Sequence, residues 1–79
     1  MTITGAQVRA ARELIKWSQS KLAAETGVSL ASIAKFEVGG ERPSMLDLSV
    51  VERMLSDAGV EFIAEKDGSA GVRLRRATP

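Results

Sequence analysis

The chain has 79 residues, 44% of them hydrophobic and 27% charged, which is an ordinary composition for one small globular domain. It contains no cysteine and no histidine, and this excludes disulfides, thiol or histidine catalysis and the usual zinc sites. No stretch approaches the roughly 20 apolar residues that span a bilayer, and the N-terminus has no secretory pattern, so we expect a cytoplasmic protein without a membrane partner.

The charges are nearly balanced. The chain has 11 Lys and Arg residues and 10 Asp and Glu residues, and residues 1–58 carry seven of each sign. Strong attraction to any nucleic acid is therefore not implied, and DNA binding must depend on how charges are arranged on one face. The carboxylates are scattered, and there is neither a phosphate-binding glycine loop nor a nucleophile elbow, so we expect no enzyme, no metal and no cofactor.

The first predicted helix follows Thr4, a residue type that often caps a helix N-terminus. Val8, Ala11 and Ile15 then recur at helical spacing, with charged residues between them. This pattern predicts a helix with one apolar face, which we expect to pack against the rest of the domain.

Two further helices are predicted on either side of a tight turn. Ser18 can cap a helix over residues 19–26, and Gly27 supplies its C-terminal stop. Ser29 can cap the next helix, at about residues 30–38. Helix, glycine turn and helix in this order are typical of a helix-turn-helix unit.

A fourth helix and a hairpin are predicted in the second half of the chain. Ser44 can cap a helix over residues 45–58, which ends at Gly59. The hydrophobic period then changes from helical to alternating, which predicts strands at about residues 60–65 and 72–75 with a turn between them.

Together these elements predict a mainly α fold, a four-helix domain with a C-terminal β-hairpin. We assign residues 1–59 to the helix-turn-helix domain and residues 60–76 to the hairpin, and we expect the last residues, 76–79, to fray. A two-stranded hairpin is marginal alone, so it should either cover the helices or pair with its copy in a second subunit, and we favour pairing. The hairpin residues predicted at this dimer interface are Val60, Phe62, Val72 and Leu74.

The segment WSQSKLAAETGVSLASIAKFEVGGERPS, residues 17–44, resembles the xenobiotic-response-element/Cro helix-turn-helix. The shared pattern runs Ser-Gln, Leu-Ala, Gly-Val-Ser, Ile, Glu-x-Gly and Pro-Ser, and the similarity extends over about residues 5–58. The resemblance implies a lambda-repressor-like four-helix domain that binds double-stranded DNA in a sequence-specific way, as a homodimeric regulator and most simply as a repressor. It also implies a partly buried ion pair between Arg12 and Glu37, because related repressors join these positions.

The recognition helix of such a domain enters the major groove. On it, Ser32 can exchange hydrogen bonds with bases, Lys35 can reach guanine or a phosphate, and an apolar residue can touch a thymine methyl group. No Arg, Asn or Gln stands at positions 30 and 31, so we expect modest or shape-assisted readout rather than strong discrimination of single bases. The predicted DNA contacts are Gln19, Lys21, Ser29, Leu30, Ala31, Ser32, Lys35 and Arg42.

A second hypothesis assigns the same fold to a protein-interaction module, such as an antitoxin or an antiactivator. The balanced charge and the apolar pair Leu30 and Ala31 favour it, and Lys21 and Arg42 are equally consistent with solvated surface charges. The two functions can coexist in one protein. They differ in whether replacing Ser32 and Lys35 abolishes function.

Overall fold

In the computed structural model, residues 3–66 and 69–75 are described. They form four helices and one antiparallel hairpin, so the predicted fold class is confirmed. The elements are α1 (Gly5–Leu14), α2 (Gln19–Thr26), α3 (Leu30–Glu37), α4 (Met45–Asp57), β1 (Val60–Lys66) and β2 (Ser69–Leu74).

All four helices begin directly after the residues whose side chains were predicted to cap them. Each of these hydroxyl groups accepts a hydrogen bond from the backbone N–H three residues further on, which satisfies one free donor of the first turn. Gly27, which ends α2, has a left-handed conformation with φ of 76°. The caps are Thr4, Ser18, Ser29 and Ser44.

The element ends differ slightly from the sequence prediction. Helix α3 stops one residue earlier, at Glu37, and α4 stops at Asp57. Strand β2 begins at Ser69, three residues before its predicted start, because Ser69 pairs with Lys66 and the strands therefore continue further toward the turn. Positions 67–68 of the predicted turn and 76–79 of the predicted frayed end lie outside the described residues.

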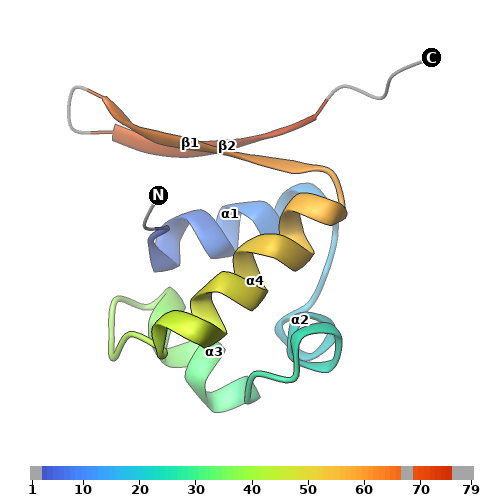
Figure 1. Cartoon of the computed structure of the whole chain (residues 1–79), viewed down its shortest axis with the longest axis vertical. Coiled ribbons are helices and arrows are strands. Elements are labelled where there is room, and N and C mark those ends of the chain that lie inside the picture. The colour runs from blue at the N-terminus through green and yellow to red at the C-terminus, as the bar shows by residue number, and fades with distance from the viewer. Residues whose placement is uncertain (1–2, 67–68, 76–79) are drawn as a thin grey trace.

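The helices and the hairpin form stacked layers (Figure 1). The hairpin lies across one end of the molecule over α1 and α4, while α2 and α3 lie at the opposite end. Apolar side chains from all four helices and from β1 meet in one core between these layers. The buried apolar residues are Ile3, Val8, Ala11, Leu22, Val28, Ile33, Phe36, Leu48, Val51, Leu55 and Val60.

One buried glutamine joins the hairpin to α1. The Gln7 side chain is only 3% exposed, and its Nε2 donates to the carbonyl oxygens of Ile63, at 3.1 Å, and Gly71, at 2.9 Å. Its Oε1 accepts from the backbone N–H of Thr4, which completes a capping box. Both strands are therefore held to the start of α1 by one fully hydrogen-bonded amide.

Replacing Gln7 by Leu should lower the free energy of unfolding by about 2–3 kcal/mol, because three backbone groups lose their partner at a buried site. Urea unfolding followed by the fluorescence of Trp17, the single tryptophan, measures this loss. The exposed Ala6→Ser on the same helix is the control and should change stability by less than about 0.5 kcal/mol. An equally small loss for Gln7→Leu would contradict the role given to this amide.

Candidate nucleic-acid interface

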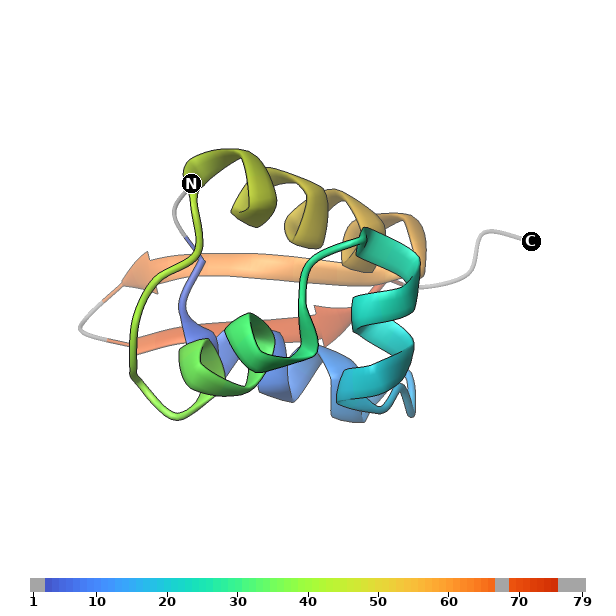
Figure 2. The same ribbon diagram turned by 90° about the horizontal axis from the view of Figure 1, so that it is seen from below.

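Helices α2 and α3 form the face of the molecule that lies away from the hairpin. Seen from below, in Figure 2, they are nearest to the viewer. The short connection between them runs from Gly27 to Ser29, and Leu22, Val28 and Ile33 are buried where the two helices meet. The helix-turn-helix geometry predicted from the sequence is thus present, and it leaves the outer side of α3 uncovered.

The outer side of α3 presents small and apolar side chains around one cation. Ala31 and Lys35 are exposed, Leu30 is 45% exposed, and Ser32 is half-buried. Among the described residues, no carboxylate forms an ion pair with Lys35. Ser29 caps the helix, and its Oγ donates to Oγ of Ser32 at 2.9 Å, so these two hydroxyls already share a hydrogen bond.

Val38 extends the same outer side and was not among the predicted contacts. It follows α3 as the C-cap residue and is 81% exposed. Its spacing of seven residues from Ala31 and three from Lys35 places it on their side of the helix. That spacing is readable in the sequence, but a valine at a helix end is assigned to the core by hydrophobicity alone.

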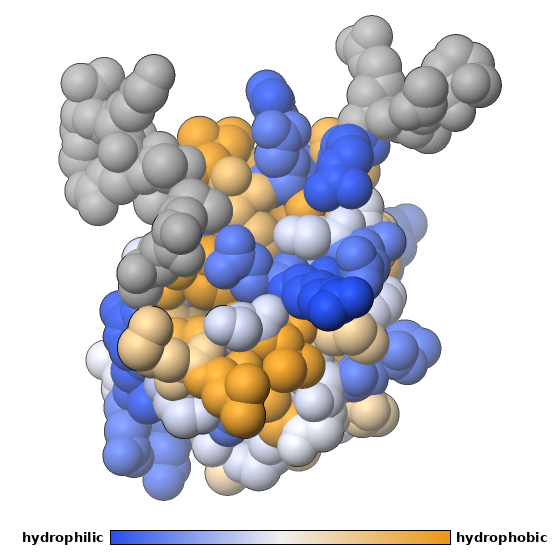
Figure 3. All heavy atoms as spheres, in the orientation of Figure 1, coloured by the Kyte–Doolittle hydropathy of each residue, from blue (hydrophilic) through white to orange (hydrophobic). Residues whose placement is uncertain are grey.

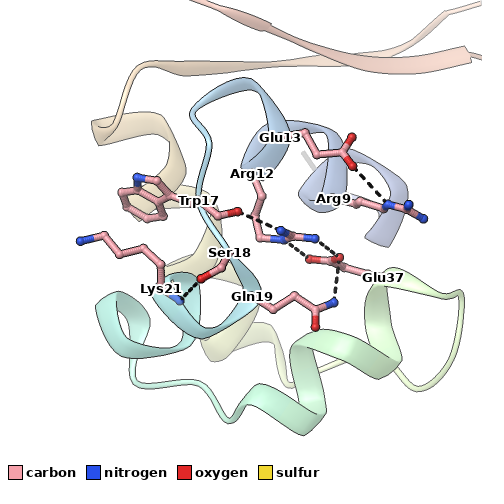
Figure 4. Close-up of polar contacts among 8 residues, drawn as sticks. All are labelled: Arg9, Arg12, Glu13, Trp17, Ser18, Gln19, Lys21 and Glu37. Carbon is pink, nitrogen blue, oxygen red and sulfur yellow. Dashed lines mark hydrogen bonds and ion pairs between the residues drawn. The ribbon is translucent and has the colours of Figure 1, made fainter.

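Gln19, the first residue of α2, is turned toward the interior rather than toward solvent. Its Nε2 donates to Oε1 of Glu37 at 3.1 Å, as Figure 4 shows. A carboxylate can only accept at this distance, so the amide nitrogen is committed to Glu37 and the amide oxygen is the free polar atom. If the Gln19 side chain contacts DNA in this orientation, its amide oxygen would accept a hydrogen bond from a base.

Lys21 and Arg42 also have partners within the chain. Nζ of Lys21 lies 3.2 Å from Glu25 and 5.5 Å from the centroid of the Trp17 ring. Cζ of Arg42 lies 5.7 Å from the centroid of the Phe36 ring. Exposed pairs of this kind contribute little free energy, so both cations remain available to a phosphate.

A shallow hollow separates α3 from the loop that leads to α4. Its volume is about 250 Å³, with Ser32 and Lys35 on one wall and Arg42 and Ser44 on the other. Two carboxylates, Glu41 and Asp47, line it as well, so the cations around it are nearly neutralised. Positive and negative charges therefore balance around the hollow, as they do in the whole sequence, and the hollow is not a strong binding site for an anion.

The structure places the two predicted ion-pair partners, Arg12 and Glu37, in direct contact between α1 and α3 (Figure 4). Nε and Nη2 of Arg12 donate to the two carboxylate oxygens of Glu37, each at 2.7 Å. Nη1 of Arg12 donates to the Trp17 carbonyl oxygen at 2.9 Å. With Gln19 bound to the same carboxylate, this network joins α1, the start of α2 and the end of α3.

A family model described as Helix-turn-helix matches residues 8–56, which includes α2, α3 and most of α1 and α4. The chain belongs to this family. Its members are the xenobiotic-response-element/Cro and lambda-repressor-like proteins, and membership supports a DNA-binding regulator. A search of curated proteins found no match. Within residues 3–66 and 69–75, no helix has the length and apolar character needed to cross a membrane.

The hairpin of this helix-turn-helix protein does not offer all four residues predicted for a dimer interface. Val60 is fully buried within the chain itself, so its side chain is not accessible to a second copy, and this part of the prediction needs correction. Phe62 and Val72 are half-buried against the core, while Leu74 is 52% exposed. Pairing through the hairpin stays a prediction, and Leu74 is the member most available for it.

The environment of Glu37 changes its pKa in two directions. Burial raises the pKa, but the hydrogen bonds donated by Arg12 and Gln19 lower it more, so the pKa lies below its ordinary value near 4.5. Hydrogen bonding to Glu37 raises the pKa of Arg12 above its ordinary value. Both groups are therefore charged at neutral pH, and the pair is ionic.

Removing the guanidinium should destabilise the helix-turn-helix domain strongly. Arg12→Met leaves a carboxylate with only 1% of its side chain exposed and without its cation, and we expect a loss of about 3 kcal/mol. Urea unfolding measures it. The double variant Arg12→Met with Glu37→Met should recover part of the loss, because no buried charge remains. A double variant that is as unstable as the sum of the single variants would show that the pair is not coupled.

Stability should also depend on pH through Glu37. Because the pKa of Glu37 is lowered on folding, its contribution is complete above about pH 4.5 and is lost as the pH falls through the folded pKa. Urea unfolding between pH 7 and pH 3 measures this dependence. Wild type should have a higher free energy of unfolding than Glu37→Gln at pH 7, and this difference should shrink toward pH 3. A constant difference between the two proteins over this range would contradict the assignment.

Proposed function

We propose that the chain is a sequence-specific DNA-binding transcriptional regulator that acts as a homodimeric repressor. The observation that carries this proposal is the uncovered outer side of α3 in a helix-turn-helix domain, with Ala31, Lys35 and Val38 aligned along it. In this role α3 enters the major groove. Two copies occupy successive grooves, about 34 Å apart, and exclude the polymerase from the site.

The chemistry of α3 determines how the groove is read. Lys35 donates to guanine or to a phosphate, and Ser32 exchanges hydrogen bonds with base edges. Leu30, Ala31 and Val38 offer apolar contact to thymine methyl groups. Since none of these side chains forms a bidentate contact, specificity rests on several weak contacts and on the shape of the duplex.

Phosphates are held beside α3 by the start of α2 and by the loop before α4. The Lys21 N–H donates to the Ser18 cap, so the N–H groups of Gln19 and Ser20, at the start of the helix, are the ones that meet a phosphate. Lys21 exchanges Glu25 for a phosphate at little cost, because the pair is exposed. Arg42 supports binding from the other side of α3, while Ser29 positions the helix as its cap.

A protein-interaction module, an antitoxin or antiactivator, is the second candidate. It is favoured by the near-neutral charge around the hollow beside α3 and by the exposure of Leu30 and Val38. A protein partner would cover the same side of α3, whereas DNA binding would require cations that are only loosely paired. The two candidates therefore predict different results for charge substitutions on α3.

Selection of bound sequences from a random duplex library, with the purified protein, tests the proposal. We expect a two-fold-symmetric site, and Lys35→Ala should weaken binding to it about tenfold, or roughly 1.4 kcal/mol. Ser32→Ala should mainly relax the base preference at one position of each half-site.

Arg53→Ala, which removes an exposed cation from α4, is the matched control and should change the affinity less than twofold. If the folded protein enriches no sequence at moderate salt, the DNA-binding proposal fails and the protein-partner function takes its place. If Lys35→Ala and Arg53→Ala weaken binding equally, the attraction is only electrostatic and α3 does not read the site.

A further inference from the structure

The outer side of α3 carries a row of apolar side chains along one flank. Leu30, Ala34 and Val38 follow one another at intervals of four residues, so they form one ridge along the helix and its C-cap. Leu30 is 45% exposed, Val38 is 81% exposed, and Ala34 between them is partly exposed. We call these three residues the α3 ridge. At the lower end of the molecule in Figure 3, where α2 and α3 lie, pale residues of intermediate hydropathy predominate.

The α3 ridge lies on the side of α3 that faces the start of α2. Leu30 precedes Glu37 by seven residues, or about two helical turns, so the two residues share one side of the helix. The carboxylate of Glu37 accepts a hydrogen bond from Gln19, the first residue of α2. Because the start of α2 is where a phosphate is proposed to bind, the ridge borders the same duplex and faces its base edges.

The polar side chains of α3 do not by themselves distinguish the two pyrimidines. In the major groove, thymine presents the O4 acceptor and a C5 methyl group, whereas cytosine presents the N4 donor and a C5 hydrogen. The Ser32 hydroxyl accepts from Ser29 and keeps its own proton and a lone pair, so it can meet either pyrimidine. Glu37 is buried in its ion pair, and Lys35 lies on the other flank, beside the hollow. The C5 methyl group is therefore the difference that remains for α3 to read.

We propose that the α3 ridge reads the C5 methyl group of pyrimidines, so that the chain distinguishes 5-methylcytosine from cytosine in its DNA site. The inference rests on the proposed function, because α3 must lie in the major groove. The methyl group of 5-methylcytosine stands at the same place in the groove as that of thymine, while its base pairing is that of cytosine. Methylation of a cytosine that faces the ridge thus strengthens binding and is a signal that this regulator senses.

The expected size of the effect follows from the burial of one methyl group. Moving a group of this size out of water raises affinity about fourfold. A two-fold-symmetric site presents each position twice, so a change made in both half-sites should alter the affinity roughly 15-fold.

Changing single methyl groups in the selected duplex tests the proposal. Each thymine, together with its symmetry mate, is replaced by uracil, which removes the C5 methyl group and keeps every hydrogen-bonding group of the base. At positions where uracil weakens binding, two further duplexes carry cytosine or 5-methylcytosine, each paired with guanine. Fluorescence anisotropy measures the dissociation constants. We expect roughly 15-fold weaker binding for uracil than for thymine, and a similar ratio for cytosine against 5-methylcytosine.

Variants of the α3 ridge show whether the ridge causes this methyl effect. Leu30→Ala removes the large side chain at the end of α3 that enters the groove, and should reduce both ratios to about threefold or less. Alanine suits a helical position, so the variant should keep its fold, which its urea midpoint checks. Val38→Ala removes an 81% exposed side chain at the other end of the ridge and serves as a second variant that folding does not complicate.

Lys35→Ala, on the other flank of the same helix, is the matched control. It should weaken binding to both members of each pair of duplexes and leave their ratio within about twofold of wild type.

The proposal is overturned if no thymine responds to uracil, or if the cytosine and 5-methylcytosine duplexes bind alike. It is also overturned if the full methyl effect persists in both Leu30→Ala and Val38→Ala, because the shape of the duplex and not the ridge then causes it. Failure of the proposed function appears separately, as the absence of an enriched sequence in the selection, and ends this inference with it. Failure of the inference alone leaves the enriched sequence and the loss in Lys35→Ala unchanged.

Discussion

The ion pair between Arg12 and Glu37 is the contact on which the arrangement of the DNA-binding unit depends. It ties α1 to the end of α3 through two hydrogen bonds of 2.7 Å, and the same two side chains also bind the Trp17 carbonyl and the Gln19 amide. A buried carboxylate without these donors would cost several kcal/mol, a large share of the stability of a chain this small. The orientation of α3 relative to α1 is therefore set by this ion pair as well as by apolar packing.

This arrangement leaves a recognition surface with little charge. The side chains of α3 that point outward are small or apolar apart from Lys35, and the acids and bases around the neighbouring hollow nearly cancel. A surface of this kind binds DNA weakly as a single copy and gains affinity when two copies act together. Weak contacts by a single copy are therefore consistent with the proposed homodimer, in which two copies share one duplex.

Local rules were sufficient for most of the fold. Hydroxyl caps and Gly27 fixed the helix starts and the central turn, and the change of hydrophobic period located the hairpin. Side-chain contacts between distant elements were harder to predict. Gln7 bonds to residues 56 and 64 positions away, and Gly5 lies so close to the Phe36 carbonyl that a Cβ there would collide with it. The residues next to Gln7 and Gly5 in the sequence form no pattern that predicts either contact. Val60 was assigned to a dimer interface because the alternation of apolar and polar residues does not show whether the apolar side of a strand is covered by the helices of the same chain or by a second subunit.

The central claim is that α3 reads DNA, and the most direct test is to follow the backbone amide resonances of the labelled protein during titration with the selected duplex. The account predicts large shifts in residues 19–21 and 29–35, small shifts in the hairpin, and a weaker, more uniform response to a duplex of unrelated sequence. Shifts confined to the hairpin or α4, or the same response to both duplexes, would contradict it.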